Sequence, residues 1–252
     1  MVITSVDNQK IKTIRALKEK KYRDELGKYH LEGYRVVKDS LDYLSEPELI
    51  FSESSFNKYA DEFPGRPYIV VADDVFAKLC DTENNQGVIC VANIKKATPD
   101  YNAEYALFLD RIRDPGNMGT IIRTALATGF IDVYCYDCVD CYNPKVVRSA
   151  MSAISRVNIF KSDESTLTQL KENGYTIISA DMGGTNAFKY EKKLKKACLC
   201  IGNEANGVSD GIARLCSLCR LPMLGRAESL NASAAASILI FETAKKINGI
   251  EF

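Results

Sequence analysis

The 252-residue sequence lacks the residues and motifs on which several common chemistries depend. It has a single histidine, His30, in the strand-like run KYHLEG. A serine or cysteine nucleophile activated by histidine would have to use that residue, which lies far in sequence from the polar loops described below. No G-x-G-x-x-G motif follows the first strand-like run, and G-x-x-x-x-G-K-[ST] is absent, so an ordinary dinucleotide fold or a P-loop has no support. Any chemistry therefore rests on Arg, Asn, Glu, Ser or backbone groups.

The sequence also lacks a net charge, with 33 basic and 33 acidic residues and a pI near 6.6. No global basic field therefore attracts a polyanion. Residues 1–38 differ, because they hold ten Lys or Arg against five Asp or Glu. Ile11, Ile14 and Leu17 recur there at helical spacing, which predicts one basic helix over residues 8–25. Such a helix docks on nucleic-acid phosphates or is simply a solvated amphipathic helix, and its sequence alone leaves both interpretations open.

Long hydrophobic runs are absent as well. The N-terminal segment MVITSVDNQKIK has no apolar core of the kind that secretion signals carry, and no run approaches the length that spans a bilayer. We therefore expect a cytoplasmic protein without a membrane partner.

Nine cysteines without a secretion signal indicate free thiols rather than a disulfide framework. Two groups have spacings that a four-thiolate zinc site could use: Cys135, Cys138 and Cys141, and then Cys216 and Cys219. However, Cys135 lies in the strand-like run DVYCYD and Cys219 precedes another short apolar run. Buried cysteine commonly acts as a small hydrophobe, so we expect no metal.

Apolar runs alternate with helical patterns along the whole chain, which indicates an α/β protein. The polar segment KKATPDYN, residues 95–102, is typical of a linker and predicts two domains. Strands are predicted over residues 29–31, 49–51, 68–71, 88–91, 105–110, 132–137, 156–160, 175–181, 197–201 and 219–223. Further helices are predicted over residues 34–44, 74–80, 118–128, 145–151, 167–173, 207–216 and 232–248.

Polar loops follow several strands of the second half, where α/β proteins bind ligands. The strand YALFLD leads into RIRDPGN, in which Asn117 is expected to cap a helix that carries Arg123 and ends at Gly129. The run ACLCI ends in Gly202, Asn203 and Glu204, and CRLPM leads to a loop that closes on Ser229, Leu230 and Asn231. One such loop could be structural, but several in one domain indicate a site.

Three segments resemble, in order, the three motifs of the SpoU/TrmH branch of the SPOUT methyltransferases. They are FLDRIRDPGNMGTIIRTALATGF, CIGNEANGVSD and LPMLGRAESLNASAAASILIFE. The segment NPKVVRSAMSAISRV resembles the family's connecting segment, so the resemblance covers residues 105–248. Residues 3–41 resemble the RNA-binding domain found ahead of the catalytic domain in many ribosomal-RNA members.

This resemblance implies a fold and an activity. The fold is a SPOUT methyltransferase domain with a deep trefoil knot at residues 104–252, preceded by a small α/β RNA-binding domain at residues 1–98. The activity is transfer of a methyl group from S-adenosylmethionine to a ribose 2′-hydroxyl, expected in ribosomal RNA, by a homodimer. Patterning could not have predicted the knot, because knots are essentially absent from folds in general.

The resemblance also assigns residues. It places three of them at the reacting ribose: Arg123, Asn117 and Glu204. A guanidinium stays protonated, so we expect Arg123 to position the ribose and a phosphate rather than to act as a base. Asn117 would orient the ribose, and Glu204 would hold Asn117 or Arg123 by hydrogen bonds. Six residues fall on the loops that hold the cofactor: Gly202, Leu221, Met223, Ser229, Leu230 and Asn231.

Alternatives remain open at this stage. The enzyme could act on transfer RNA or on a base nitrogen, although the segment ESLN favours the ribose class. The chain could also be a catalytically silent RNA-binding module, but such a module needs none of the polar residues named above. The sequence does not name the target nucleotide.

Overall fold

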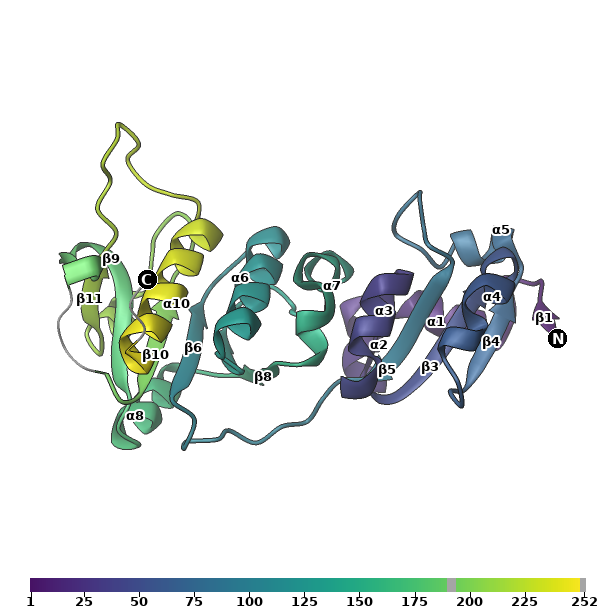
Figure 1. Ribbon diagram of the computed structural model, residues 1–252, viewed down its shortest axis with the longest axis horizontal. Helices are drawn as coiled ribbons and strands as arrows, with labels where there is room; N and C mark the ends of the chain where they lie inside the picture. Colours follow the sequence, from purple (N-terminus) through teal and green to yellow (C-terminus); the bar gives the residue numbers. More distant parts are fainter. Residues whose placement is uncertain (190–193, 250–252) are drawn as a thin grey trace. The chain divides into compact units, whose positions relative to one another are not determined.

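A computed structural model describes residues 1–189 and 194–249 (Figure 1). The chain divides into two compact units. The first combines Met1–Lys95 with Tyr142–Arg156, and the second combines Lys96–Cys141 with Val157–Phe252. The sequence places a single boundary in the linker near residue 100, whereas the structure returns a later segment to the first unit. Among the described residues, no helix is long and apolar enough to cross a membrane.

The first unit is built on a five-stranded mixed sheet in the order β1-β4-β3-β5-β2. Strands β1, β4 and β3 are parallel, and β5 is antiparallel to both β3 and β2. The strands are β1 (Val2–Ile3), β2 (Lys28–Glu32), β3 (Ser45–Ser52), β4 (Tyr68–Val71) and β5 (Val88–Asn93). The helices are α1 (Gln9–Ala16), α2 (Lys20–Leu26), α3 (Tyr34–Ser40), α4 (Glu53–Tyr59), α5 (Asp73–Ala77) and α7 (Pro144–Ala150), with 3-10 turns at Leu41–Tyr43, Ala60–Glu62 and Met151–Ser155.

The predicted single helix over residues 8–25 is wrong, because the chain breaks it into α1 and α2. Arg23 is only 2% exposed, and its Nη1 donates hydrogen bonds to the carbonyl oxygens of Leu17 and Lys18 at 2.7 and 2.8 Å. These carbonyls lie at the end of α1, where a helix lacks its own donors. One of the basic residues counted toward RNA binding is thus a buried structural cap.

The segment Tyr142–Arg156 is tied to the first unit by specific contacts. The rings of Tyr142 and Tyr29 lie 4.9 Å apart, Arg148 Nη1 lies 3.2 Å from Asp81 Oδ2, and Arg156 Nη2 donates to the Asp39 carbonyl at 2.7 Å. None of these pairings has a local sequence signal, which is why a boundary drawn from composition misses them.

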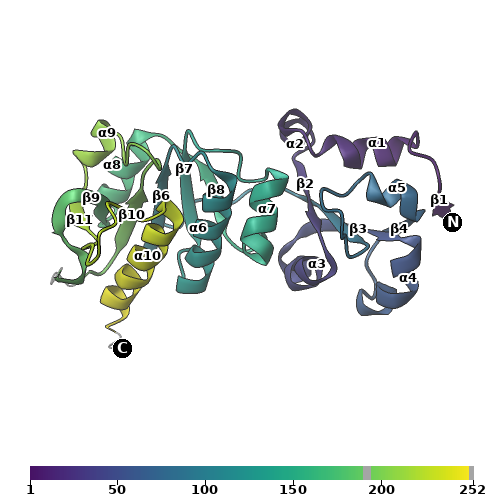
Figure 2. The same cartoon turned by 90° about the horizontal axis from the view of Figure 1, so that it is seen from above.

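The second unit is a three-layer α/β structure. Its six strands are all parallel, in the order β11-β9-β10-β6-β7-β8. Helices α8 and α9 lie on one side of the sheet, and α6 and α10 lie on the other (Figure 2). The strands are β6 (Tyr105–Asp110), β7 (Asp132–Tyr136), β8 (Asn158–Lys161), β9 (Thr176–Asn186), β10 (Ala197–Ile201) and β11 (Ser217–Arg220). The helices are α6 (Pro115–Thr128), α8 (Glu164–Glu172), α9 (Asp210–Ala213) and α10 (Ala232–Asn248), with a 3-10 turn at Ala187–Lys189.

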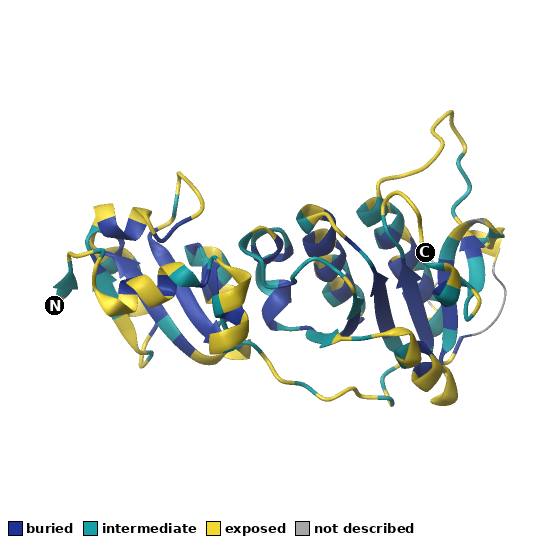
Figure 3. Cartoon of the chain, turned by 180° about the vertical axis from the view of Figure 1, so that it is seen from behind, coloured by how far each residue is buried: buried dark blue, intermediate teal, exposed yellow. Residues whose placement is uncertain are grey.

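The central strands of both units are buried, while exposed residues concentrate on helices and loops (Figure 3). In the second unit, Phe108 and Cys200 of the sheet and Leu170 of α8 share one core cluster and are fully buried. The strand order reverses between β6 and β10, and the crevice beyond such a reversal is where open α/β sheets bind ligands. The α/β fold expected from the sequence is confirmed; the trefoil knot remains a prediction.

Candidate active site

The loop after β6 begins α6 at Pro115, earlier than the sequence indicated. Asp114 is the N-cap, and its Oδ1 accepts the backbone N–H of Asn117 at 2.7 Å. The prediction that Asn117 caps this helix is therefore wrong. Because Asp114 satisfies the free amide of the first turn, the Asn117 side chain is available for other partners.

Asn117 joins the three loops into one hydrogen-bonded chain. Its Nδ2 donates to Glu204 Oε1 at 3.1 Å, and its Oδ1 accepts from Asn231 Nδ2 at 3.0 Å. Asn231 is also the N-cap of α10, where its Oδ1 accepts the backbone amides of Ser233 and Ala234. The hydrogen bond expected between Glu204 and Asn117 is thus present, and both ends of the Asn117 amide are held.

Glu204 also holds the loop that precedes α6. Its two carboxylate oxygens accept the backbone amides of Asp114 and Arg113 at 3.3 and 3.5 Å. Burial by itself raises the pKa of Glu204, but the hydrogen bonds from Asn117 and these amides outweigh it and leave the pKa below the usual value. Glu204 is therefore ionised at neutral pH and acts as an acceptor.

A cavity of about 380 Å³ lies beside this network. Five of the six residues assigned to the cofactor line it: Gly202, Leu221, Met223, Ser229 and Leu230. Asn231 is the exception, because it caps α10 and holds Asn117. The volume falls within the range of about 300–1,000 Å³ found for small-molecule sites, and the lining combines aliphatic side chains with loop backbone, which suits a nucleoside-containing cofactor.

Packing of the adjacent turn requires a glycine at position 202. A Cβ at this position would lie 2.1 Å from the backbone carbon of Gly207 and from the amide nitrogen of Val208. Asn203 and Gly207 exchange two backbone hydrogen bonds at 2.9 Å, so this turn cannot move away freely. The tight turn replaces the beginning of the predicted helix over residues 207–216, of which only α9 is helical.

Arg123 lies outside this network and does not line the cavity. It is exposed on α6 and forms no hydrogen bond or ion pair with any residue that the structure describes. The next residue, Thr124, lies with its Oγ1 3.0 Å from Ser237 Oγ of α10, which places the two helices side by side. A free guanidinium at this position can meet an anionic substrate without first breaking an internal contact.

Sequence reasoning missed a second network behind the site. Asp110 is fully buried, and its Oδ2 accepts the Ser209 amide at 2.6 Å, while its Oδ1 accepts from Arg111 Nε at 2.9 Å. Arg111 has a left-handed φ of 56°, and its carbonyl accepts Asn203 Nδ2 at 3.0 Å. The sequence offers a signal for Asp110, because this residue is a carboxylate at the end of an apolar strand. It offers no signal for the strained backbone of Arg111.

The cysteines whose spacing could suit a zinc site form the two groups named from the sequence. Cys135 and Cys141 lie with their Sγ atoms 3.5 Å apart, and Cys138 Sγ contacts the Leu109 carbonyl at 3.2 Å. Cys216 Sγ contacts the Ile212 carbonyl at 3.1 Å, and Cys219 is buried in β11. Across residues 1–189 and 194–249, no three His, Cys, Asp or Glu side chains form a group that could hold a metal ion.

His30 belongs to the first unit and is 5% exposed. Burial lowers the pKa of His30 to about 4, so the ring is neutral at physiological pH. It lies in β2, in the core of the first unit.

Comparisons with known proteins show to which family the chain is related. The profile of the SpoU rRNA methylase family matches residues 104–241, and the profile of an MRM3-like substrate binding domain matches residues 8–90. The chain is 29% identical to the 23S rRNA (guanosine(2553)-2′-O)-methyltransferase RlmP of Bacillus subtilis, over 95% of this chain and 97% of the relative. It is 26% identical to the human mitochondrial rRNA methyltransferase 3, over 92% of this chain and 71% of that protein.

Solved structures agree with this relationship. An rRNA methyltransferase from Sinorhizobium meliloti with S-adenosylmethionine bound superposes with a TM-score of 0.85 and 29% identity, over 97% of each chain. The AviRb methyltransferase of Streptomyces viridochromogenes shares the fold with a TM-score of 0.80 over 96% of this chain, at 23% identity. The chain belongs to the SpoU rRNA methylase family.

Proposed function

We propose that this protein transfers a methyl group from S-adenosylmethionine to a ribose 2′-hydroxyl of ribosomal RNA. The observation that carries the proposal is the chain Glu204–Asn117–Asn231, which fixes a polar amide beside a cavity of cofactor size. When bound, the cofactor supplies an electrophilic methyl group on a sulfonium. Residues of the protein have to align the hydroxyl and accommodate the proton that it loses.

The roles follow from what each side chain can do. Gly202, Leu221, Met223, Ser229 and Leu230 would hold the cofactor in the cavity that they line. Asn117 would orient the ribose, because Glu204 and Asn231 determine which way its amide points. Arg123, which has no internal partner among the described residues, would position the ribose and a neighbouring phosphate through its planar set of donors.

The first unit would supply RNA affinity. Its basic segment and its match to a substrate binding domain support this role, although Arg23 is buried and does not contribute. Neutralised phosphates release counterions, so binding should weaken steeply with salt. A truncation at residue 98 would remove the packing partners of Tyr142–Arg156, so point variants are a cleaner test. Lys12→Gln and Lys21→Gln should each reduce the salt slope by about 1, and an unchanged slope in both would contradict the assignment.

A homodimer in the cytoplasm completes the proposal. On α10, Ile238 and Phe241 are 39% and 50% exposed, and Phe188 beside them is 53% exposed. These side chains line a shallow cavity of about 390 Å³ in the second unit. A contiguous exposed apolar patch of this kind is typical of a protein interface, and a second copy of the chain is the partner proposed.

Mapping of 2′-O-methyl positions tests the activity. Ribosomal RNA from cells with and without the protein should differ at one or a few nucleotides, and the purified protein should restore the missing mark with S-adenosylmethionine. Loss of a mark in transfer RNA only would assign the substrate differently. Loss of a base methyl group, or of no mark at all, would overturn ribose methylation.

A further inference from the structure

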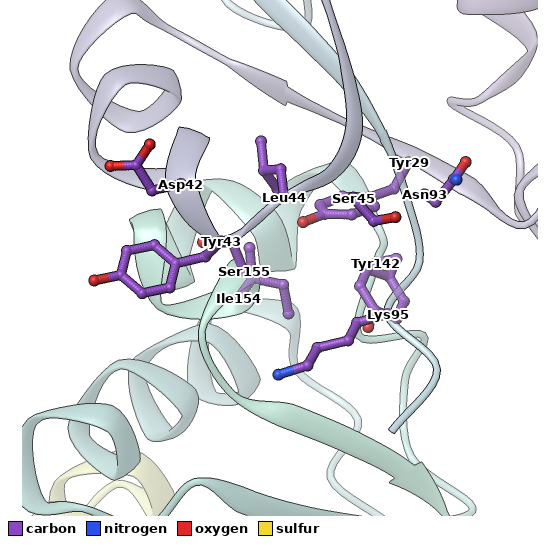
Figure 4. A pocket seen from close by; sticks show the side chains of 10 residues that line it. All are labelled: Tyr29, Asp42, Tyr43, Leu44, Ser45, Asn93, Lys95, Tyr142, Ile154 and Ser155. Atoms are coloured by element: carbon purple, nitrogen blue, oxygen red, sulfur yellow. The ribbon is translucent and has the colours of Figure 1, made fainter. Parts of the chain in front are cut away.

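The first unit contains a pocket that the proposed chemistry does not use (Figure 4). It measures about 230 Å³, below the range of about 300–1,000 Å³ typical of drug-sized ligands. Its walls come from the ends of β2 and β5, the start of β3 and the segment Tyr142–Arg156. Figure 4 shows Tyr142 and Lys95 on one side and Tyr43 and Leu44 on the other. The space suits one small planar group.

One tyrosine hydroxyl opens onto this pocket. Tyr29 lines it and is 2% exposed, yet its hydroxyl forms no hydrogen bond within the described residues. Burial is the main cause that raises the pKa of Tyr29 well above its usual value, and the neighbouring Tyr142 raises it further. The hydroxyl therefore stays protonated. The hydroxyl oxygen is not sealed from solvent, so within the pocket it can bond to the edge of a ligand. Ser45, an exposed residue at the start of β3, adds a second hydroxyl to the lining.

Aromatic and cationic side chains lie at the edges of the same pocket. Tyr43 is 54% exposed, and the Arg156 guanidinium carbon lies 4.2 Å from its ring centroid on one face. Lys95 is exposed and has no hydrogen bond or ion pair among the residues described. Asp42 is the acidic residue of the lining; its Oδ1 lies 3.4 Å from Arg66 Nη2, and it forms no ion pair with Lys95 among the described residues.

We infer that this pocket binds an unpaired nucleobase of the RNA, with the adjacent phosphate at Lys95. Single-stranded RNA is recognised by stacking bases on aromatic rings and by hydrogen bonds to their edges, and this pocket offers both beside a free cation. Tyr43 provides the stacking surface, and Tyr29 and Ser45 contact the base edge. The inference rests on RNA being the substrate, and it assigns the first unit a preference for an unstacked nucleotide rather than for a duplex.

Binding of short oligonucleotides to the full-length protein tests the pocket independently of methyl transfer. Unstructured eight-nucleotide homopolymers of U, C and A are titrated with the protein, and fluorescence anisotropy reports the affinity. Tyr43→Ala should weaken binding by roughly 5- to 150-fold, the range expected for loss of one base–aromatic contact. The matched control is Tyr68→Ala, because Tyr68 is 53% exposed in the same unit but does not line the pocket.

Two further variants separate a binding role from a structural one. Tyr29→Phe removes only the hydroxyl, so it should change the ranking of the three homopolymers while thermal unfolding stays within a few degrees of wild type. Lys95→Gln should reduce the salt slope of oligonucleotide binding by about 1. Wild-type affinity and ranking in Tyr29→Phe and Tyr43→Ala, or no binding of any homopolymer by the wild type, would overturn the inference. Failure to methylate ribosomal RNA would overturn the proposed function alone, since the oligonucleotide titration does not depend on it.

Discussion

Asn117 donates its side-chain amide to Glu204 across 3.1 Å, joining the start of α6 to the loop after β10 over 87 residues of sequence. Asn231 then donates to the Asn117 oxygen at 3.0 Å. The three residues come from three loops, and each has its remaining polar atoms held by backbone groups or neighbours. Contacts within the chain therefore hold the site together, which favours precise alignment of a weak nucleophile.

If this network is cooperative, Asn117→Ala and Glu204→Ala should not be additive. Each removes one end of the same hydrogen bond, so the double variant should lose less stability than the sum of the singles, with a coupling of about 0.5–3 kcal/mol. Urea unfolding of the four proteins measures the free energies of unfolding. Additive losses would mean that the two side chains stabilise the loops separately.

The charge of Glu204 gives a pH dependence. The pKa of Glu204 in the folded protein lies below the ordinary value of 4.5, so its ionised form stabilises the fold. That contribution is complete above about pH 4.5 and is lost as the pH falls through the lower, folded value. Glu204→Gln should therefore destabilise the protein most near neutral pH, and the difference from wild type should shrink in acid. A difference that grows on acidification would contradict this assignment.

The sequence predicted the periodic elements well and the irregular ones poorly. The helix over residues 232–248 and the cap at Gly129, which has a φ of 88°, are confirmed, because both depend on local pattern and local backbone freedom. The predicted helix over residues 8–25 is instead two helices, and Arg23 donates to the carbonyl oxygens of Leu17 and Lys18, which lie six and five residues earlier in the chain. The hydrophobic spacing from which the helix was predicted does not show such a side-chain contact.

The candidate site likewise has a part that the sequence predicts and a part that it does not. The motif loops and their polar residues could be located, because the carboxyl ends of parallel strands meet at one edge of the sheet. The hydrogen-bond partners of Asp110 could not be predicted, since its contact with the Ser209 amide joins residues 99 apart in sequence. The packing role of Gly202 was also hidden, because the backbone that it touches belongs to a turn predicted as helix.

Gly202 and Ala235 separate loop packing from cofactor binding. Gly202→Ala places a Cβ against the Gly207 turn, so it should lower the free energy of unfolding by about 1–3 kcal/mol and weaken S-adenosylmethionine binding as well. Ala235 lines the same cavity from α10. Ala235→Leu should weaken binding with a much smaller loss of stability. Calorimetric titration with both variants checks this, and full affinity in Ala235→Leu would place the cofactor elsewhere.

The apolar patch on α10 predicts the oligomeric state. Phe241 is half exposed in the chain, so Phe241→Asp should leave the fold of one copy nearly unchanged but place a charge in the proposed interface. Sedimentation should shift from a dimer to the 28.0 kDa monomer. Leu26→Asp, at a 41% exposed apolar position of the first unit, is the control and should remain dimeric. A wild-type protein that sediments as a monomer at micromolar concentration would refute the homodimer.

Arg123 offers the sharpest separation of catalysis from stability. It is exposed on α6 and has no partner among the described residues, so Arg123→Ala should change the free energy of unfolding by no more than about 0.5 kcal/mol. If the guanidinium holds the ribose and a phosphate in the transition state, the same change should reduce turnover by roughly 10²–10⁴-fold while cofactor affinity stays intact.

Arg123→Lys then distinguishes positioning from proton abstraction. Lysine keeps the charge but loses the planar fork that can bind a hydroxyl and a phosphate together, so most activity should be lost. Single-turnover rates measured across pH check this result. Near-normal turnover in the lysine variant, with a pH optimum that follows the amine, would instead make residue 123 the base. The positioning role would then pass to Asn117, whose amide is already held by Glu204 and Asn231.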